Sequence, residues 1–421
     1  MTSVVAVGDQ AVRRWAASGM MALTGDGDGP PRASMAGVAT VADELAAQWA
    51  AAGSWLGQAV EVDGPAVLAQ RAAWAGLRRQ GSVSAGGVAR FEQAADGWIV
   101  VNLPRTEDVA MLPALLGENV DPGDWAAIRV GLAHRPTDEL TERAAQLGIA
   151  VARPGEYPPV NQPVQVLAEG RPVTAENDRR PLVVDLSSLW AGPLAGSLLA
   201  AAGARVIKVE GLGRWDGARR GPVGFFDRLN AGKEMALVDF AQGDPLLARL
   251  VASADLVIEG SRPRVMERLG IDPEVVAAEH GTSWLSITGH GRVDAPMRVG
   301  FGDDAAVAGG LWWHHGDHVG FLGDAIADPL TGLVAAIAGA KALAGHRGRV
   351  LDVPLARVSS WVAGRTSVDD EAEVVRSGDD WVVRVADRWE PVAQPHPSEV
   401  HGRAAEAGAD TEALRDEFGP R

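Results

Sequence analysis

The stretch PLVVDLSSLWAGPLAGSLLAAAGARVIKVE, residues 181–210, decides the fold of the second half of the chain. It begins with PLVVDLSS, a short apolar run typical of a strand that is buried on both faces. The Ala191-Gly192-Pro193 turn then opens an Ala- and Leu-rich helix that ends at Gly203, and ARVIKVE follows as a second strand. Strand, helix and strand in this order form a βαβ unit, so we expect a parallel sheet.

The same α/β pattern continues to about Gly300. Further strands are predicted at ALVDF (236–240), DLVIEG (255–260) and SWLSITG (283–289), and PLLARLVASA (245–254) is a helical segment between two of them. We therefore predict an open α/β layer over this part of the chain.

A boundary is predicted at residues 171–180, where RPVTAENDRR combines proline with a run of charges immediately before the apolar strand. We take this segment as a linker between a unit of residues 1–170 and a unit of residues 181–421. The first unit mixes Ala-rich helices, at 41–53 and 64–77, with a strand candidate, GWIVVNL, after Asp96, and is α+β in character.

The two units share one order of parts. Residues 19–76 and 309–364 each contain a Gly/Asp loop, a long Ala-rich helix, a short strand (AVEVD at 59–63, RVLDV at 349–353) and a second amphipathic helix ending in Ala-Gly. One explanation is that Ala-rich helices generally resemble one another. We favour a degenerate internal duplication.

Composition excludes several classes of function. The 421 residues are 47% hydrophobic and include no cysteine, which rules out disulfides, a thiolate nucleophile and a cysteine-ligated metal. A net charge of −16 argues against a nucleic-acid partner. The N-terminus lacks the pattern of a signal peptide, and no apolar stretch reaches the roughly 20 residues of a membrane span. We expect a cytoplasmic protein that has no membrane partner.

Several consecutive motifs resemble the family III (CaiB/BaiF-type) CoA-transferases in order, spacing and residue type. After the stretch quoted first, they are RLNAGKEMALVDF (228–240), DLVIEGSRPRVMERLGID (255–272), SITGHGR (286–292) and GFGDDAAVAGGL (300–311). The resemblance covers about Pro181 to Arg357, and GRAAEAGADTEALRDEFG (402–419) resembles the family's C-terminal helix.

The resemblance implies a Rossmann-like CoA-binding domain and an acyl-CoA:carboxylate CoA-transferase that works through an aspartyl-CoA thioester. The implied partners are an acyl-CoA and a carboxylic acid acceptor, with no cofactor beyond CoA itself as a substrate and no metal. It also implies an interlocked homodimer, or a pseudo-dimer within one chain. Since the chain is acidic, a CoA site would need a local basic cluster and backbone amides.

The resemblance assigns CoA contacts to five residues. Leu189, Trp190 and Ala191 match the loop that lies along CoA, and their turn at a helix N-terminus offers free backbone amides. Lys233 and Arg268 match basic positions that contact the CoA nucleotide; the alternative for either is an ordinary solvated surface cation, and we favour binding because phosphate contacts need such donors.

The chain departs from the family at two basic positions. The family often has a basic residue where Gly211 and Thr288 stand here. Basic side chains nearby are candidates to replace them: Arg214, Arg219, Arg220 and Arg262.

The family's catalytic aspartate, at the start of a helix, matches Asp303, with Asp304 as the alternative if the loop is shifted by one residue. Aspartate before an Ala run is also a routine helix cap, and a pair of aspartates permits both roles. Attack by a carboxylate on a thioester gives a mixed anhydride and then an aspartyl thioester. Gly309 and Gly310 would let backbone amides approach the thioester oxygen.

Two other readings stay open. Related CoA-ester racemases pair the aspartate with a histidine, and His280 lies near that position, so the chain is alternatively an acyl-CoA racemase or isomerase that exchanges the α-proton. The substituted basic positions also fit a non-catalytic CoA-binding pseudoenzyme.

Other titratable residues are expected to have minor roles. The loop histidines His314, His315 and His318 are expected to be solvated rather than zinc ligands. Asp324 and Asp328, in GDAIADPLTG, match a region where the family has an acidic residue before a helix, and we expect them to support the site or cap that helix.

The resemblance implies a small domain after the catalytic part. The segment between Trp361 and Trp381 is too short to hold it. Family-like small-domain sequence occurs instead at 95–117, and residues 15–31 resemble the segment after the catalytic aspartate. Because Asp9 is displaced from the expected position, we expect this copy to be catalytically silent. We predict that residues 1–170 pack against 181–421 as the second copy.

Overall fold

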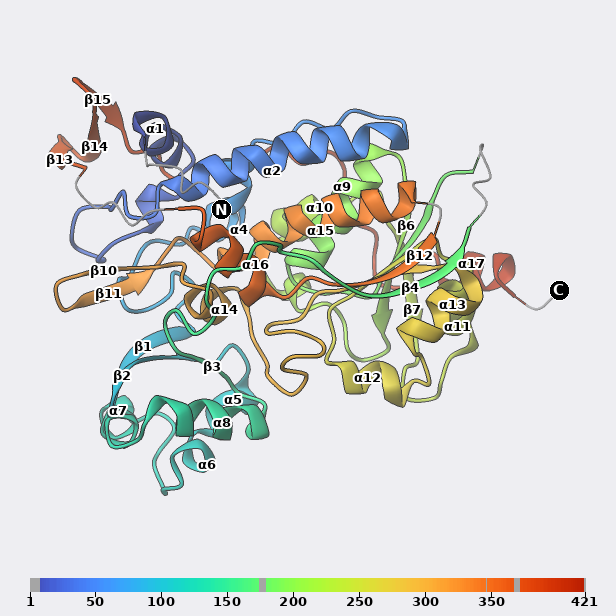
Figure 1. Ribbon diagram of the computed structural model, residues 1–421, viewed down its shortest axis with the longest axis horizontal. Coiled ribbons are helices and arrows are strands. Elements are labelled where there is room, and N and C mark those ends of the chain that lie inside the picture. Colours follow the sequence, from blue (N-terminus) through green and yellow to red (C-terminus); the bar gives the residue numbers. More distant parts are fainter. Residues whose placement is uncertain (1–7, 174–178, 346, 367–371, 420–421) are drawn as a thin grey trace.

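The computed structural model describes residues 8–173, 179–345, 347–366 and 372–419, and is built around a seven-stranded sheet (Figure 1). Six strands are parallel, and the edge strand β4 runs antiparallel to its neighbour β12. In spatial order the strands are β4 (Gln165–Pro172), β12 (Arg347–Asp352), β9 (Ser283–Ser286), β8 (Leu256–Glu259), β5 (Leu182–Asp185), β6 (Arg205–Gly211) and β7 (Glu234–Val238). The predicted parallel α/β layer is confirmed.

The predicted boundary at 171–180 does not separate the sheet from the residues before it. Strand β4 ends inside that segment, at Pro172, and pairs with β12 from the second half. Its inner positions, such as Leu167, pack against the core of the sheet, so β4 is structurally part of the second half. Residues 174–178 of the predicted linker lie outside the described part of the chain.

Helices cover both faces of the sheet. Val183 of β5 packs into the cluster on one face and Val184 into the cluster on the other, which explains the continuous apolar run of this strand. One face carries α9 (Ala191–Ala202) and α15 (Ala327–Ala344), with α10 (Val223–Asn230) beside α9. The other carries α11 (Pro245–Ser253), α12 (Pro263–Arg268) and α13 (Pro273–His280), and α17 (Thr411–Glu417) lies against β7.

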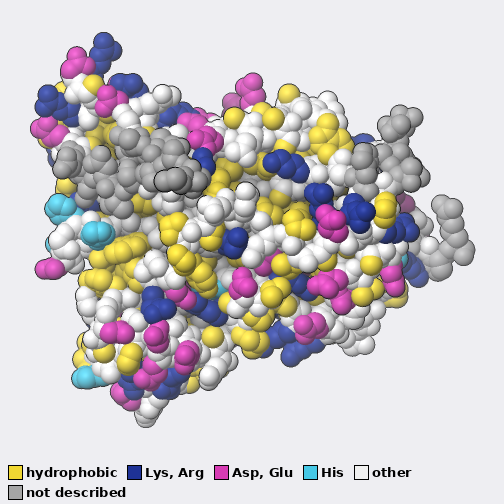
Figure 2. Space-filling view, in the orientation of Figure 1, with side chains coloured by type: hydrophobic (Ala, Val, Ile, Leu, Met, Phe, Trp, Pro, Cys, Tyr) yellow, Lys and Arg dark blue, Asp and Glu magenta, His cyan; other side chains and the backbone are white. Residues whose placement is uncertain are grey.

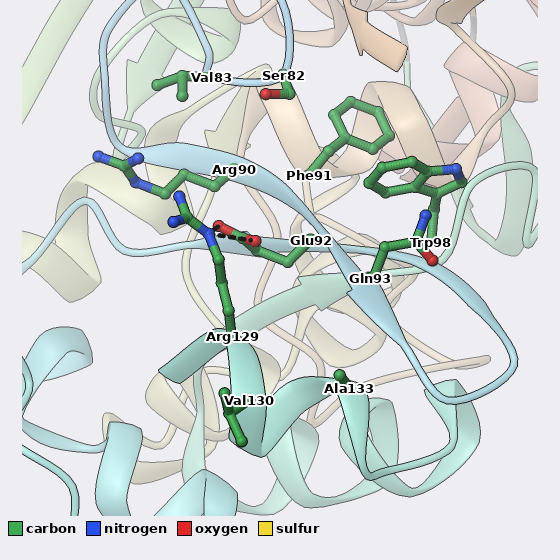
Figure 3. A pocket seen from close by; sticks show the side chains of 10 residues that line it. All are labelled: Ser82, Val83, Arg90, Phe91, Glu92, Gln93, Trp98, Arg129, Val130 and Ala133. Atoms are coloured by element: carbon green, nitrogen blue, oxygen red, sulfur yellow. Dashed lines mark hydrogen bonds and ion pairs between the residues drawn. The ribbon is translucent and has the colours of Figure 1, made fainter. Parts of the chain in front are cut away.

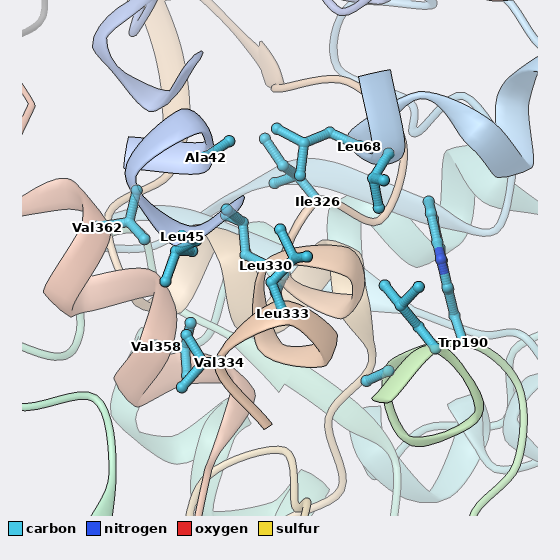
Figure 4. Packing of buried hydrophobic residues seen from close by; sticks show 14 of the residues in the cluster. Ala42, Leu45, Leu68, Trp190, Ile326, Leu330, Leu333, Val334, Val358 and Val362 are labelled. Atoms are coloured by element: carbon cyan, nitrogen blue, oxygen red, sulfur yellow. The ribbon is translucent and has the colours of Figure 1, made fainter. Parts of the chain in front are cut away.

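Helix α15 lies at the centre of the largest core cluster (Figure 4). It is long and apolar enough to cross a membrane by length and composition, but 78% of it is buried inside the protein, as in a core helix. Gly332 lets α15 approach α9 closely, because a Cβ there would lie 2.9 Å from the carbonyl oxygen of Ala191. Leu330, Leu333 and Val334 fill the space toward the neighbouring helices.

The N-terminal helices pack onto this same core. Leu45 and Ala42 of α2 (Gly37–Gly53) face α15 from the side opposite the sheet (Figure 4). The other elements here are α1 (Asp9–Ala17), η1 (Met21–Leu23), η2 (Ser54–Leu56), α3 (Gly64–Leu68), α4 (Gln70–Ala75) and, from the second half, α16 (Leu355–Ala363).

The prediction of a strand at 59–63 is wrong. Val60 and Val62 pack against the core, but no strand among the described residues pairs with this segment, so it stays extended without forming a sheet. The corresponding prediction at 349–353 is confirmed by β12.

Part of the N-terminal half forms a small α+β domain that projects from the rest of the molecule (Figure 1). Its antiparallel sheet includes the strand predicted at 97–103, and Ile99 and Val101 bury one face against its helices. The strands are β1 (Ala89–Ala94), β2 (Gly97–Asn102) and β3 (Ala150–Ala152), and the helices are α5 (Thr106–Ala110), α6 (Leu112–Leu116), α7 (Trp125–Ala133) and α8 (Thr137–Leu147).

The remaining elements connect these layers. Helix α14 (Gly302–Ala308) lies between the small domain and α15, and η3 (Gly217–Arg220) follows β6. Asp9 begins α1, which contacts α2 and the C-terminal sheet. That sheet is β13 (Val374–Ser377), β14 (Asp380–Val385) and β15 (Arg388–Pro391), and the hairpin after α14 is β10 (Trp312–His315) and β11 (His318–Phe321).

We predict that the two halves unfold as one unit. Because Leu45 is 2% exposed and packs against α15, Leu45→Ala should lower the free energy of unfolding by about 2–5 kcal/mol. Calorimetry should still show one transition for the whole chain. The exposed Gln48 on the same helix gives the control, since Gln48→Ala should leave stability nearly unchanged. A fragment of residues 181–421 that is monomeric and cooperatively folded would contradict a shared core.

Candidate functional site

The loop between β5 and α9 presents the predicted CoA-contacting residues at the carboxyl end of the sheet. Leu189 is 42% exposed and has a φ of +72°, a left-handed conformation that a leucine rarely adopts. Trp190 is buried, and Ala191 begins α9. Such a conformation persists only where the surroundings hold it.

Buried ion pairs hold this loop. Lys208 Nζ lies 2.9 Å from Asp216 Oδ2 and donates a hydrogen bond to the Ser187 carbonyl oxygen. Asp216 in turn accepts a hydrogen bond of 3.0 Å from the Leu189 backbone amide. The loop conformation therefore depends on charges in β6 and in the segment after it.

Lys233 forms a second buried ion pair, at the junction between β5 and the first turn of α9. Its Nζ lies 2.8 Å from Asp185 Oδ2, 3.0 Å from the Pro193 carbonyl oxygen and 3.1 Å from Asn230 Oδ1, and the side chain has no exposure. Burial lowers the pKa of Lys233 to about 8. Burial would raise the pKa of Asp185, but the positive charges of Lys233 and Lys208 outweigh burial and lower that pKa to about 2. Sequence reasoning predicted a cation facing CoA, whereas the structure places Lys233 inside the sheet-to-helix junction.

An arginine cluster lies beside the loop. We use this name for Arg214, Arg262, Arg264 and Arg268, none of which has a side-chain ion pair or hydrogen bond within the described ranges. Burial, together with the other arginines, lowers the pKa of Arg262, which shows that like charges converge there. Arg214 and Arg268 are exposed. This cluster is a local positive field in an acidic protein.

The other basic candidates are placed differently. Arg219 is bound to Glu210 at 2.6 Å and stacks on Phe226, so its charge is already used within the fold. Arg220 is exposed at the end of η3. Thr288 accepts a hydrogen bond from the Gly291 amide, and Gly211 ends β6.

A carboxylate cluster, which we define as Asp303, Asp324 and Asp328, lies where α14 meets the start of α15. Arg71 from α4 donates two hydrogen bonds to Asp324, one of them 2.9 Å long from Nε. Asp303 accepts a hydrogen bond of 2.8 Å from the Ala325 amide. Burial raises the pKa of both Asp303 and Asp328 to about 7; Asp324 adds to the shift and Arg71 opposes it.

Arg71 links the carboxylate cluster to the loop between β5 and α9, residues 186–190, which we call the CoA loop because CoA contacts are predicted for it. Its guanidinium lies 5.9 Å from the centre of the Trp190 ring. Although burial works against it, Asp324 raises the pKa of Arg71 above its ordinary value, so this cation stays charged. The predicted residues Asp303 and Trp190 are thus brought to one place by a residue that the sequence did not reveal.

Asp304 faces away from this cluster, toward the small domain. Its Oδ1 accepts hydrogen bonds from the Phe301 amide at 2.9 Å and from Asn102 Nδ2 at 2.7 Å. Its Oδ2 lies 3.8 Å from His290 Nε2, and neither of these two buried atoms has a hydrogen-bond partner. Tyr157 lies 3.1 Å from the other ring nitrogen of His290. Asp304 therefore acts as the cap of α14 and the anchor of the small domain.

The structure places His280, the histidine considered for an acid–base pair, away from helix α14 and its two aspartates. His280 ends α13, which packs against β4, β12 and α11, whereas α14 contacts α15, α16, β2 and β3. His290 lies beside Asp304 instead, because Gly300 has no side chain and leaves room for its ring. The Gly-His-Gly pattern at 289–291 was the available signal.

The loop histidines lie on the β10–β11 hairpin, where they are exposed (Figure 2). His318 Nδ1 lies 3.6 Å from Asp26. Among the residues that the structure describes, no group of three or more His, Cys, Asp or Glu is arranged to hold a metal.

Two open cavities lie outside the predicted site. A cavity of about 480 Å³ on the small domain is lined by Phe91 and Trp98 and by the Arg129–Glu92 ion pair (Figure 3). Another, of about 400 Å³, lies between α2 and α15 and includes Lys341. Neither is lined by the carboxylate cluster or the arginine cluster.

Comparison with known proteins finds matches to the second half of the chain. Residues 181–381 match the family model described as CoA-transferase family III. A succinyl-CoA–D-citramalate CoA-transferase from Chloroflexus aurantiacus is 30% identical over 204 residues, which are 43% of this chain and 50% of that protein. An acyl-CoA transferase from Fusarium pseudograminearum is 34% identical over 149 residues, 31% of this chain and 32% of the relative. The chain thus spans a third to a half of the length of these curated relatives.

Other matches include a human alpha-methylacyl-CoA racemase, 37% identical over 101 residues, which are 23% of this chain and 24% of the racemase. Among solved structures, a hypothetical protein from Mycobacterium tuberculosis is 26% identical with a TM-score of 0.44, covering 51% of this chain and 66% of that one.

We predict that Lys233 stabilises the fold. Lys233→Ala should leave Asp185 charged and buried without its partner, which typically costs about 3–5 kcal/mol. Arg268→Ala, at an exposed and unpaired position, should change the free energy of unfolding by less than about 0.5 kcal/mol. Urea denaturation of both variants measures the difference. Equal stability of the two variants would show that the buried pair is dispensable.

Proposed function

We propose that this chain transfers CoA from an acyl-CoA to a free carboxylic acid, because residues 181–381 match the model of CoA-transferase family III. The observation that carries the proposal is the close approach of the CoA loop to the carboxylate cluster through Arg71 and Trp190. A thioester bound along the loop would have its reactive carbon near enzyme carboxylates. The acyl-CoA donor and the acceptor acid would be the only small molecules that the reaction requires.

The CoA nucleotide would bind at the arginine cluster. Leu189 and Trp215 expose apolar surface here, 42% and 58% respectively, and a Cβ on Gly217 would lie 3.0 Å from the Leu189 side chain. Unpaired arginines beside exposed apolar groups suit a ligand that combines phosphates with adenine and pantetheine. Lys233 would contribute by holding the loop rather than by touching CoA.

The reaction would pass through an enzyme-bound aspartyl thioester. A carboxylate oxygen attacks the thioester carbon, and the C–S bond breaks as CoA leaves as a thiolate, giving a mixed anhydride. The thiolate then attacks the aspartyl carbon and displaces the free acid. The acceptor acid repeats these steps in reverse order, so atoms and charge balance without a redox partner. Of the two predicted residues, Asp303 suits this role better, since Asp304 Oδ2 is fully buried.

A second candidate is exchange of the α-proton of an acyl-CoA. It is favoured by one observation, the separation of 3.8 Å between His290 Nε2 and Asp304 Oδ2, which suits an acid–base pair. Such an activity would need no acceptor acid. Uptake of solvent deuterium into acyl-CoA in the absence of an acceptor would distinguish it from transfer.

The decisive experiment is an exchange assay. The full-length protein, incubated with succinyl-CoA and labelled acetate, or with acetyl-CoA and labelled succinate, should move CoA to the labelled acid. Hydroxylamine should trap an aspartyl hydroxamate only when acyl-CoA is present. Stoichiometric CoA binding with no exchange for any donor–acceptor pair, and no trapped aspartate, would identify a non-catalytic CoA-binding protein instead.

We also predict that the arginine cluster determines CoA affinity. Removing one charge-assisted phosphate contact by Arg268→Ala or Arg262→Ala should weaken CoA binding by about 1.5–3 kcal/mol, roughly 10- to 100-fold. Calorimetric titration measures this. Arg384→Ala, an exposed arginine on β14, is the matched control and should bind CoA as the unmodified chain does. Unchanged affinity in both cluster variants would place the nucleotide elsewhere.

A further inference from the structure

The cavity of about 400 Å³ lies beside the C-terminal half of α15. The helix lines it with Val334, Ile337, Ala338 and Lys341, whose i, i+3, i+4 and i+7 spacing places them on one face. At a rise of 1.5 Å per residue, Lys341 is about 20 Å along the helix from Asp328 in the carboxylate cluster. The cavity is therefore separate from the proposed transferase site.

Both halves of the chain build this cavity. Helix α2 contributes Leu45 and Gln48, and the segment before β4 contributes residues 161–164. From the second half, Leu351 of β12 and Trp361 of α16 join the face of α15. The volume falls within the range of about 300–1,000 Å³ that is typical of small-molecule sites.

The charged side chains that line the cavity are all basic. They are Lys341, Arg349 and Arg365, and no aspartate or glutamate among the described residues lines it. Because the whole chain has 55 acidic and 39 basic residues, this concentration of positive charge is local. Figure 2 shows basic side chains beside apolar ones over the region where α15 lies in Figure 1. The cavity thus favours an anionic ligand.

Two of these cations have donors without partners. The Nε atoms of Arg349 and Arg365 are buried and have no hydrogen-bond acceptor in the described part of the chain. Glu169 lies 3.9 Å from Arg349 Nε, beyond hydrogen-bond distance, and Glu44 pairs with Nη2 of Arg365. Lys341 is exposed, with no ion pair or hydrogen bond within the described ranges. Buried donors normally have an acceptor, which a bound anion would supply here.

The rest of the wall is mostly apolar. Val334, Ile337 and Leu351 are at most 5% exposed and form its floor. Trp361 adds an aromatic ring, and the Arg365 guanidinium lies 4.9 Å from the centre of that ring. A small inorganic anion would leave this apolar surface in contact with water, whereas an alkyl chain would cover it. A ligand with an anionic head and an apolar tail matches both parts of the wall.

We propose that this cavity binds a free fatty acid, with its carboxylate at Lys341 and Arg349 and its alkyl chain along α15 between Ile337 and Trp361. The site is distinct from the proposed CoA site, so the inference goes beyond the transferase function and does not depend on it. Because α2 and α15 both line the cavity, the bound acid would contact both halves of the chain. Binding to the folded state alone would stabilise that state.

Calorimetric titration of the full chain with sodium decanoate, below the concentration at which it forms micelles, tests the proposal. Decanol, sodium acetate and inorganic phosphate are the comparison probes, because each lacks either the charge or the chain. The variants are Lys341→Glu and Lys341→Arg. Arg388→Glu, at an exposed position on β15, is the matched control because it changes the net charge as Lys341→Glu does. Each variant is first melted to confirm that it folds, and each titration is repeated with saturating CoA.

Decanoate should bind and raise the melting temperature, while decanol, acetate and phosphate should bind at least roughly tenfold more weakly, since a charge-assisted hydrogen bond or the burial of the chain is lost. Lys341→Glu should weaken decanoate binding by roughly 10- to 100-fold or more. Lys341→Arg and Arg388→Glu should bind decanoate as the unmodified chain does. Saturating CoA should leave the affinity unchanged.

Absence of decanoate binding would overturn the proposal. Equal binding of decanol would show an apolar cleft that does not select for charge, and equal binding of acetate or phosphate would show a plain anion site; either result also overturns it. Decanoate binding that CoA abolishes, or that Lys341→Glu leaves unchanged, would place the ligand elsewhere and contradict the assignment. The exchange assay with succinyl-CoA tests the transferase function separately, so the failure of one proposal is distinguishable from the failure of the other.

Discussion

The burial of α15 is the constraint on which the rest of the structure depends. This apolar helix touches α9 and the sheet on one side and α2 and α16 on the other, so neither half of the chain has a complete core without it. Its close contact with α9 requires Gly332. Because α9 starts at the CoA loop and α15 starts at the carboxylate cluster, the packing of the two helices also fixes the distance between the two parts of the site.

The N-terminal half completes the site as well as the core. Arg71 reaches Asp324, Asn102 reaches Asp304, and Tyr157 reaches His290, all from residues before the seven-stranded sheet begins. These contacts join the two halves through charged and polar groups that are partly or fully buried, where an unpaired partner would be costly. The side-by-side arrangement of α2 and α15 is compatible with an internal duplication, which remains a prediction, as does the pairing of two chains.

Much of the second half could be predicted from sequence because its signals are local. The apolar runs of β5 and β8 and the glycine at Gly203 determine strands and a helix end by themselves. The predicted strand at 59–63 failed because strand formation also needs a neighbour to pair with, which no local pattern reveals. The resemblance predicts roles for Asp303 and the CoA loop, which remain predictions, but Arg71 and Asn102 belong to unrelated stretches of sequence that only the tertiary structure brings beside them.

The burial of Lys233, which the sequence did not predict, has a physical cause. A lysine after a Gly turn is indistinguishable, in sequence, from one that faces solvent; what decides its role is whether a carboxylate lies at the end of the adjacent strand. Here Asp185 does, and the pair is fully buried. Burying two charges has a large desolvation cost, so such a pair is better explained by the conformation it imposes than by net stability. Asp185 also accepts hydrogen bonds from the Ser187 amide and hydroxyl, and Lys233 donates one to the Pro193 carbonyl oxygen, so this pair holds both the start of the loop after β5 and the first turn of α9.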